Sequence, residues 1–397
     1  MKPIRIALFD VDGVLITPGG YRRATADTIR SVLDEINLAQ YTPDEKVFEH
    51  FESLGITSEW DMIPLYLCIV LNAVAEQTNT AHQWQTLKDV KKELSRKNLE
   101  LSFDTNAQQE RIGQITKGQP EAPSELIFEA QKEKQFPFKA LVGTGILSDL
   151  LSSTRSIYLS PTTAHFQEHT LGSDLFETRY HIKTTNHYEN YLATYDNLAL
   201  NTQSHILLEK LVQSNSFKMS IYSARPSLPP TGVTPDHNAA YSPEAEQALK
   251  MIAIDKIQMS AFGKLTWLAK QVNLTADQCL KPSLIHPLSA IAAHFTDEIT
   301  ALHWAASCYQ AQKNGTCNPI PPFSFPQAIE LHVFEDSPGG LKGGNAAAQV
   351  LTELGIDAML SLWGISKNAK KKTALQAQGG TVFEDINTAI FAALGEI

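Results

Sequence analysis

The 397-residue sequence has few cysteines, and its 33 lysine and arginine residues are outnumbered by 43 aspartates and glutamates. Its four cysteines are scattered, which excludes a disulfide framework and predicts reduced thiols. The formal net charge of −10 repels polyanions at long range, and no local basic patch stands out. The sequence therefore predicts no binding to nucleic acid or to an anionic membrane surface.

Long hydrophobic runs are also absent. The longest apolar stretch, residues 62–75, is interrupted by Pro64 and Asn72 and is shorter than the roughly 20 residues of a membrane span, so it predicts a buried helix. The first ten residues contain no apolar segment followed by a cleavage site, so we expect no secretory signal and a cytoplasmic protein. The length and the ordinary hydrophobic content of 43% predict two or three globular domains.

The sequence does contain an interrupted strand and helix pattern. Residues 4–9 predict a buried strand, and residues 218–222 predict another. From residue 331 onward strands alternate with helices, with strands expected at 331–334, 358–363 and 381–383. The intervening region is mostly helical, with short strands expected at 156–159 and 179–183. We predict an α/β core with a parallel sheet, formed by residues 1–19 and 201–397, and a helical unit at residues 20–200.

Acidic or polar residues follow three of the predicted strands. Asp10 and Asp12 follow the first, Ser223 follows the second, and Glu335 and Asp336 follow the third. Taken singly, an Asp-Gly pair also indicates a hairpin turn, and an acidic pair also suits the start of a helix. Because ligands of open parallel sheets bind at the carboxyl ends of the strands, the three positions together indicate one site.

The segments FDVDGV (9–14), SIYSARP (220–226) and VFEDSPGG (333–340) resemble, in order, three of the four motifs of the haloacid dehalogenase superfamily of phosphohydrolases. The resemblance covers about half of the chain. It implies a Rossmann-like core with a large, mainly helical cap domain inserted between motifs one and two. The third motif needs a lysine before a helix, and Lys281, in the segment Lys-Pro-Ser, resembles it more closely than the alternative, Lys264.

The chemistry of phosphate esters explains these residue types. An attacking carboxylate meets an anionic phosphoryl group, so cations and fixed donors have to neutralise the repulsion. The resemblance implies that Asp10 is the nucleophile, that Asp12 is the general acid and base, and that Ser223 and Lys281 contact the phosphoryl oxygens. It also implies a Mg²⁺ ion, since this cation prefers oxygen ligands, which here would be Asp10, the Asp12 carbonyl, Glu335 and Asp336.

Substrate contacts are expected from the residues that follow motifs one and two, namely Gly13, Ala224 and Arg225. In the helical unit, Trp60 and Asp61 either form a turn that faces the substrate or belong to the start of a buried helix. Arg22 and Arg23 either contact an anionic substrate or form a solvated basic face. Two metal sites stay open as weaker hypotheses, one at His165 and His169 and one at His303, Cys308 and Cys317.

We therefore expect a Mg²⁺-dependent phosphatase that acts on a small phosphorylated metabolite. Within the resemblance, the acid at Asp12 favours phosphoryl transfer over dehalogenation, because a departing halide needs no proton. Two alternatives stay open: a phosphomutase with the same nucleophile, and a non-catalytic protein that binds a phosphorylated ligand. The substrate and the oligomeric state are not predicted.

Overall fold

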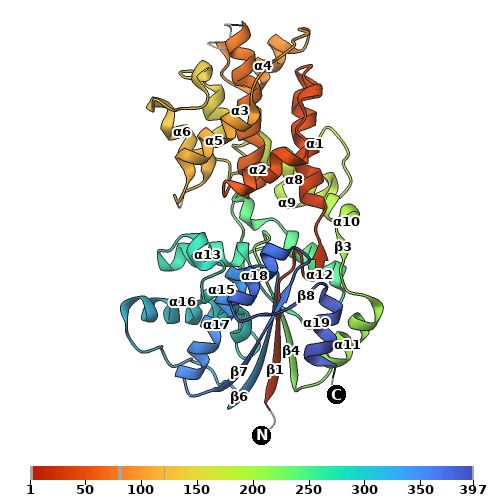
Figure 1. Ribbon diagram of the computed structural model, residues 1–397, viewed down its shortest axis with the longest axis vertical. Coiled ribbons are helices and arrows are strands. Elements are labelled where there is room, and N and C mark those ends of the chain that lie inside the picture. The colour runs from red at the N-terminus through yellow and green to blue at the C-terminus, as the bar shows by residue number, and fades with distance from the viewer. Residues whose placement is uncertain (1–2, 79–82, 120, 396–397) are drawn as a thin grey trace. The chain divides into compact units, whose positions relative to one another are not determined.

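A computed structural model describes residues 3–78, 83–119 and 121–395. The chain divides into two compact units, shown in Figure 1. One comprises Met1–Pro18, Asp196–Asp236 and Ala240–Ile397, and the other comprises Gly19–Tyr195 with His237–Ala239. The predicted division fell after residues 19 and 200. The return of residues 237–239 to the second unit was not anticipated.

The first unit contains a six-stranded parallel sheet in the order β5-β4-β1-β6-β7-β8. This is an α/β architecture with a Rossmann-like sheet, as the alternating pattern predicts. The strands at β1, β4, β6, β7 and β8 are where the sequence predicts them, whereas the short β5 was missed. The strands are β1 (Ile4–Phe9), β4 (Phe217–Ser223), β5 (Gln258–Ala261), β6 (Ala328–Glu335), β7 (Asp357–Ile365) and β8 (Thr381–Phe383).

Helices cover both faces of this sheet, and the central strand explains why (Figure 1). In β1, Ile6 and Leu8 point into one hydrophobic core, while Ala7 and Phe9 point into the other. This alternation buries the strand on both faces, which is typical of parallel sheets. The helices are α11 (Thr202–Val212), α12 (Glu244–Ile252), α13 (Phe262–Val272), α14 (Ala276–Cys279), α15 (Ile285–Ala292), α16 (Glu298–Asn314), α17 (Pro338–Glu353), α18 (Ala369–Ala377) and α19 (Ile386–Leu394).

A small antiparallel pair lies in this unit beside the points where the chain leaves and returns. Its strands are β2 (Ile16–Thr17) and β3 (Asn197–Leu198), and Ala199 N–H also donates to the Leu15 carbonyl at 2.8 Å. These bonds fix the residues on either side of the helical unit to one another within the α/β unit.

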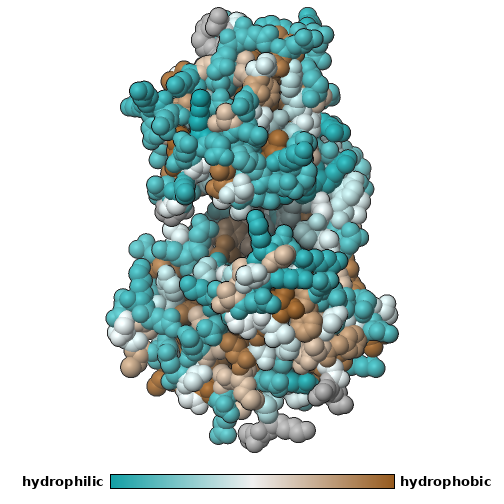
Figure 2. Space-filling view, in the orientation of Figure 1, coloured by the Kyte–Doolittle hydropathy of each residue, from teal (hydrophilic) through white to brown (hydrophobic). Residues whose placement is uncertain are grey.

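The second unit is helical around one buried helix. Helix α3 (Glu59–Thr78) includes the predicted apolar stretch, and every residue from Trp60 to Ala75 is buried. The face of this unit seen in Figure 2 is mostly hydrophilic, because the apolar side chains lie inside. The other helices are α1 (Gly20–Glu35), α2 (Glu45–Ser53), α4 (Leu87–Leu94), α5 (Thr105–Thr116), α6 (Pro123–Glu129), α7 (Ile146–Leu151), α8 (Pro161–Leu171), α9 (Ser173–Tyr180) and α10 (Tyr191–Tyr195).

The two strands expected in the helical unit are wrong. Residues 179 and 180 belong to α9, and Ser156 forms only an isolated bridge with Asn238. Residues 157–159 form turns and residues 181–183 have no regular structure, so the strand propensity of these short runs did not decide their conformation. Among the described residues, no helix combines the length and hydropathy needed to cross a bilayer.

Candidate active site

The three motif strands are neighbours in the sheet, so the residues that follow them meet at one edge. Phe9 pairs with Ile221 of β4 and with Phe334 of β6. The rings of Phe9 and Phe334 stack at 4.4 Å, and Asp10 N–H donates to the Phe334 carbonyl at 3.0 Å. This packing holds the ends of β1 and β6 in register and places the two acidic motifs side by side.

Three carboxylates converge at this edge. Asp10, Glu335 and Asp336 each offer an oxygen, and these oxygens lie within 4.8 Å of one another. Burial raises the pKa of Asp10 well above its usual range, and the neighbouring Glu335 and Asp336 charges raise it further, although Lys281 opposes them. Burial also raises the pKa of Asp336. Carboxylate oxygens are hard ligands, so this group could hold a hard divalent cation, of which Mg²⁺ is one.

Lys281 lies inside the carboxylate cluster. Its Nζ lies 2.7 Å from Asp10 Oδ1, forms an ion pair with Glu335, and sits 4.5 Å from the centre of the Tyr222 ring. Burial alone would lower the pKa of Lys281, but the two carboxylates raise it, so the ammonium stays charged. Lys264 instead pairs with Glu298. Of the two candidate lysines, the structure therefore brings Lys281 to the site.

Glu335 and Asp336, at the end of β6, differ in how many of their carboxylate oxygens already have a hydrogen-bond partner. Glu335 Oε1 accepts from Lys281, while its Oε2 accepts from the Ser337 backbone N–H at 2.9 Å and from its hydroxyl at 2.7 Å. Both oxygens of Glu335 are thus engaged, and it orients Lys281 and the start of α17. Among the described residues, Asp336 is bonded through Oδ2 to Lys371 only, so Asp10 and Asp336 are the carboxylates with oxygens left to coordinate a cation.

Gly13 is required by the geometry of the loop. Its φ is +78°, and a Cβ there would come within 2.6 Å of Asp336 Oδ2. Any other residue would combine left-handed backbone strain with a collision at a cluster carboxylate. We predicted Gly13 as a substrate contact. In the structure, a glycine is needed there because the backbone passes close to the Asp336 carboxylate.

Asp12 and Ser223 are linked through Arg225. The Arg225 Nε and Nη2 donate to the two Asp12 oxygens at 2.9 and 2.6 Å, and Nη2 also donates to Asp196 Oδ2 at 2.8 Å. The backbone N–H of Arg225 donates to Ser223 Oγ at 3.1 Å, and Ala224 between them is exposed. The guanidinium of Arg225, which we predicted as a substrate contact, is thus occupied by two carboxylates.

Trp60 and Asp61 lie within the first turn of α3 in the helical unit, and both are buried. The Asp61 side chain is fully buried and accepts from Arg155 Nη2 at 2.6 Å and from the Ser124 backbone N–H at 3.2 Å. The Trp60 ring packs against the same guanidinium at 5.1 Å. Of the two interpretations in the sequence, the start of a buried helix describes this structure.

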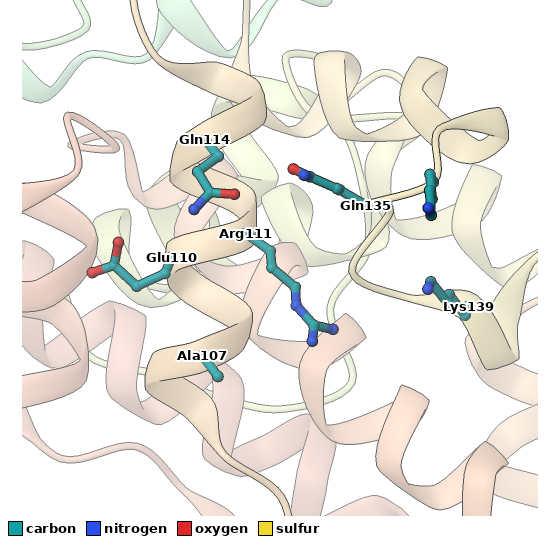
Figure 3. A pocket seen from close by; sticks show the side chains of 7 residues that line it. Ala107, Glu110, Arg111, Gln114, Gln135 and Lys139 are labelled. Atoms are coloured by element: carbon teal, nitrogen blue, oxygen red, sulfur yellow. The ribbon is translucent and has the colours of Figure 1, made fainter.

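The other charged candidates of the helical unit also have local partners. Arg22 pairs with Glu45 and Glu52, and Arg23 pairs with Asp27. A hollow of about 610 Å³ beside α5 is lined mostly by basic and amide side chains, together with Ala107 and Glu110 (Figure 3). None of the predicted site residues lines it.

Neither of the two weaker metal-site hypotheses is supported by a set of ligands among the described residues. His165 and His169 stack at 4.9 Å between ring centres, and His303 packs edge-on against Trp267. Cys308 is buried while Cys317 is exposed. Across the described residues, the only group of three or more potential metal ligands is the cluster of Asp10, Glu335 and Asp336.

Sequence reasoning missed three residues at the site. Lys371 in α18 binds Asp336, Tyr222 lies under Lys281, and Asp196 holds Arg225. Lys371 is one of three consecutive lysines, so the pattern shows a basic helix start without showing which lysine turns inward. Asp196 carries no local signal, because its partner is distant in sequence.

The comparisons with known proteins add a fold but no activity. No protein-family model and no curated protein matches the chain. The chain is similar to an X-ray structure described as target ZR25 of the Northeast Structural Genomics Consortium, with a TM-score of 0.59 and 15% identity over 97% of both chains. Likeness at this identity shows the fold alone. The protein is therefore an α/β protein with a Rossmann-like parallel sheet.

Proposed function

We propose that this protein is a Mg²⁺-dependent phosphomonoesterase of the haloacid dehalogenase type that acts on a small phosphorylated metabolite. The observation that carries the proposal is the buried cluster in which Lys281 bridges Asp10 and Glu335 beside Asp336. Buried charge of this kind costs folding free energy, so its retention at the carboxyl edge of a sheet favours a catalytic role.

In the first step, an oxygen of Asp10 attacks phosphorus and the bond from phosphorus to the ester oxygen breaks. Lys281 and the Val11 N–H both approach Asp10 Oδ1, so we assign the attack to Oδ2, to which no donor of the described residues is bonded. Asp12 gives a proton to the departing oxygen, so the products are an aspartyl-phosphate and an alcohol. Lys281 and the Ser223 hydroxyl stabilise the phosphoryl oxygens.

In the second step, a water molecule attacks the aspartyl-phosphate while Asp12 takes its proton. The bond from phosphorus to Asp10 breaks, releasing inorganic phosphate and restoring both aspartates. Asp10 and Asp336 would hold Mg²⁺, which supplies positive charge to the phosphoryl group when bound. Asp12 favours this chemistry over dehalogenation, because an alkoxide needs a proton on leaving and a halide does not.

The test is phosphate release from a panel of small phosphomonoesters, with Mg²⁺ and with chelator, for the native protein and Asp10→Asn. Asp357→Asn is the matched control, since Asp357 is an exposed aspartate at the start of β7. We expect Mg²⁺-dependent release that is lost in Asp10→Asn by about a thousandfold or more and retained in the control. Release that survives in Asp10→Asn, or no release from any ester, would contradict the proposal.

A further inference from the structure

The buried guanidinium of Arg225 links two carboxylates of different exposure. The Arg225 side chain is 1% exposed and that of Asp196 is fully buried, whereas the Asp12 side chain is 35% exposed. Two parallel hydrogen bonds to one carboxylate fix both its position and its plane, which a single ammonium cannot do. Arg225 therefore fixes the Asp12 carboxylate from one side, while part of the Asp12 side chain stays exposed to solvent.

Asp196 makes that support rigid. It accepts from Arg225 Nη2, the same nitrogen that donates to Asp12 Oδ1, so the guanidinium is held between the two carboxylates. Asp196 is fixed in turn, because it directly precedes β3, which pairs with β2. Because the Asp196 side chain is fully buried, it does not reach a substrate directly, and its link to Asp12 runs through the Arg225 guanidinium.

We propose that Arg225, anchored by Asp196, is a positioning residue that aims the Asp12 carboxyl at the ester oxygen of the substrate. This inference rests on the proposed phosphatase function and adds a residue pair to it. Arg225 does not contact the phosphoryl group in this scheme. Its contribution is confined to the proton that Asp12 delivers to the departing alcohol.

Because Arg225 acts only through Asp12, we expect its substitution to slow substrates with different leaving groups to different extents. An alkyl phosphate releases a strongly basic alkoxide and needs the proton, whereas p-nitrophenyl phosphate releases a stable phenolate and needs little help. Misplacing Asp12 therefore slows the alkyl ester more than the aryl ester. Loss of a phosphate-binding residue would instead slow both esters equally, because they share the same phosphoryl group.

The experiment measures kcat/KM for glycerol phosphate and p-nitrophenyl phosphate with Mg²⁺, in the native protein, Arg225→Lys and Asp196→Asn. The ratio of the two values is independent of the fraction of folded protein, so a merely structural defect does not change it. Glu298→Gln is the matched control, since it breaks the Lys264–Glu298 ion pair elsewhere in the same unit. Asp12→Asn gives the pattern expected when the acid is absent.

We expect both variants to lower the alkyl-to-aryl ratio by about tenfold or more, in the direction of Asp12→Asn, and the control to leave it unchanged. Equal losses on both esters in the two variants, with a selective loss in Asp12→Asn, would overturn the inference while leaving the phosphatase intact. No release by the native protein would overturn both. Asp196→Asn, which keeps the guanidinium, decides the matter if Arg225→Lys does not fold.

Discussion

The two units of this protein treat buried charge in opposite ways. In the helical unit, the buried Asp61 has its own guanidinium, Arg155, and a further bond from Ser124. In the α/β unit, Asp10 and Glu335 share the ammonium of Lys281, and Asp336, which pairs with the partly exposed Lys371, brings a third carboxylate within 4.8 Å of them. One unit satisfies its buried charge internally, and the other leaves negative charge in excess.

The difference distinguishes a structural ion pair from a candidate active site. A paired buried charge serves the fold once its desolvation is offset by hydrogen bonds. An excess that folding leaves uncompensated has to be balanced by something that the chain does not supply, such as a cation or a charged substrate. The predictions below test this contrast.

The largest expected effect is at Asp10. Without Mg²⁺, burial, Glu335 and Asp336 oppose the ionisation of Asp10, whereas Lys281 favours it. Because Lys281 keeps Glu335 as its partner in Asp10→Asn, we expect the free energy of unfolding to rise by about 1 kcal/mol. Phosphate release is lost in the same variant. Urea unfolding in chelator measures the first effect, and a clear loss of stability would place Asp10 among the structural charges.

The opposite outcome is expected at Asp61. Asp61→Ala leaves Arg155 and the Ser124 N–H without their buried acceptor, so the free energy of unfolding falls by about 3 kcal/mol. The KM of the remaining folded protein stays unchanged, because the carboxylate is buried. Urea unfolding and steady-state kinetics measure the two quantities, and a selective rise in KM would restore Asp61 as a substrate contact.

The helical unit is also expected to lose stability in acid through His169. Burial, and to a lesser extent the neighbouring His165, lowers the pKa of His169 to about 4, below the roughly 6.5 of an unfolded chain. Between these values the unfolded state binds more protons, so stability is full above pH 6.5 and falls as the pH drops toward 4.

His169→Leu therefore weakens this pH dependence by about 2 kcal/mol across the window, measured by urea unfolding at a series of pH values. His187→Leu provides the control, since it removes an exposed histidine. An unchanged slope in His169→Leu would show that other groups control the acid sensitivity.

The smallest expected effect is at Lys371. Its ammonium competes with a cation for Asp336 Oδ2, so Lys371→Met raises Mg²⁺ affinity by roughly threefold, in keeping with a half-exposed ion pair. Lys372→Met is the control, because Lys372 pairs with Glu384. Titration calorimetry compares the variants, and weaker Mg²⁺ binding in Lys371→Met would mean that Lys371 orients Asp336.

Much of the α/β unit could be predicted because its signals are local. The apolar runs of β1, β4 and β6 and the polar residues that end them lie next to one another in the sequence, and a short continuous apolar run predicts a buried strand. The four-residue β5 was missed because its QMSA sequence has neither length nor β-branched residues. The two strands expected in the helical unit were wrong because a short apolar run is compatible with more than one local structure.

By itself, the sequence determined that Asp10, Ser223 and Glu335 each lie at the end of a buried strand of a predicted parallel sheet. Only the tertiary structure decided which cations meet them. It selected Lys281 over Lys264, turned Lys371 toward Asp336, and joined Arg225 to Asp12 across 213 residues of sequence. The physical reason is that strand patterns are encoded between adjacent residues, whereas an ion pair depends on how distant segments pack.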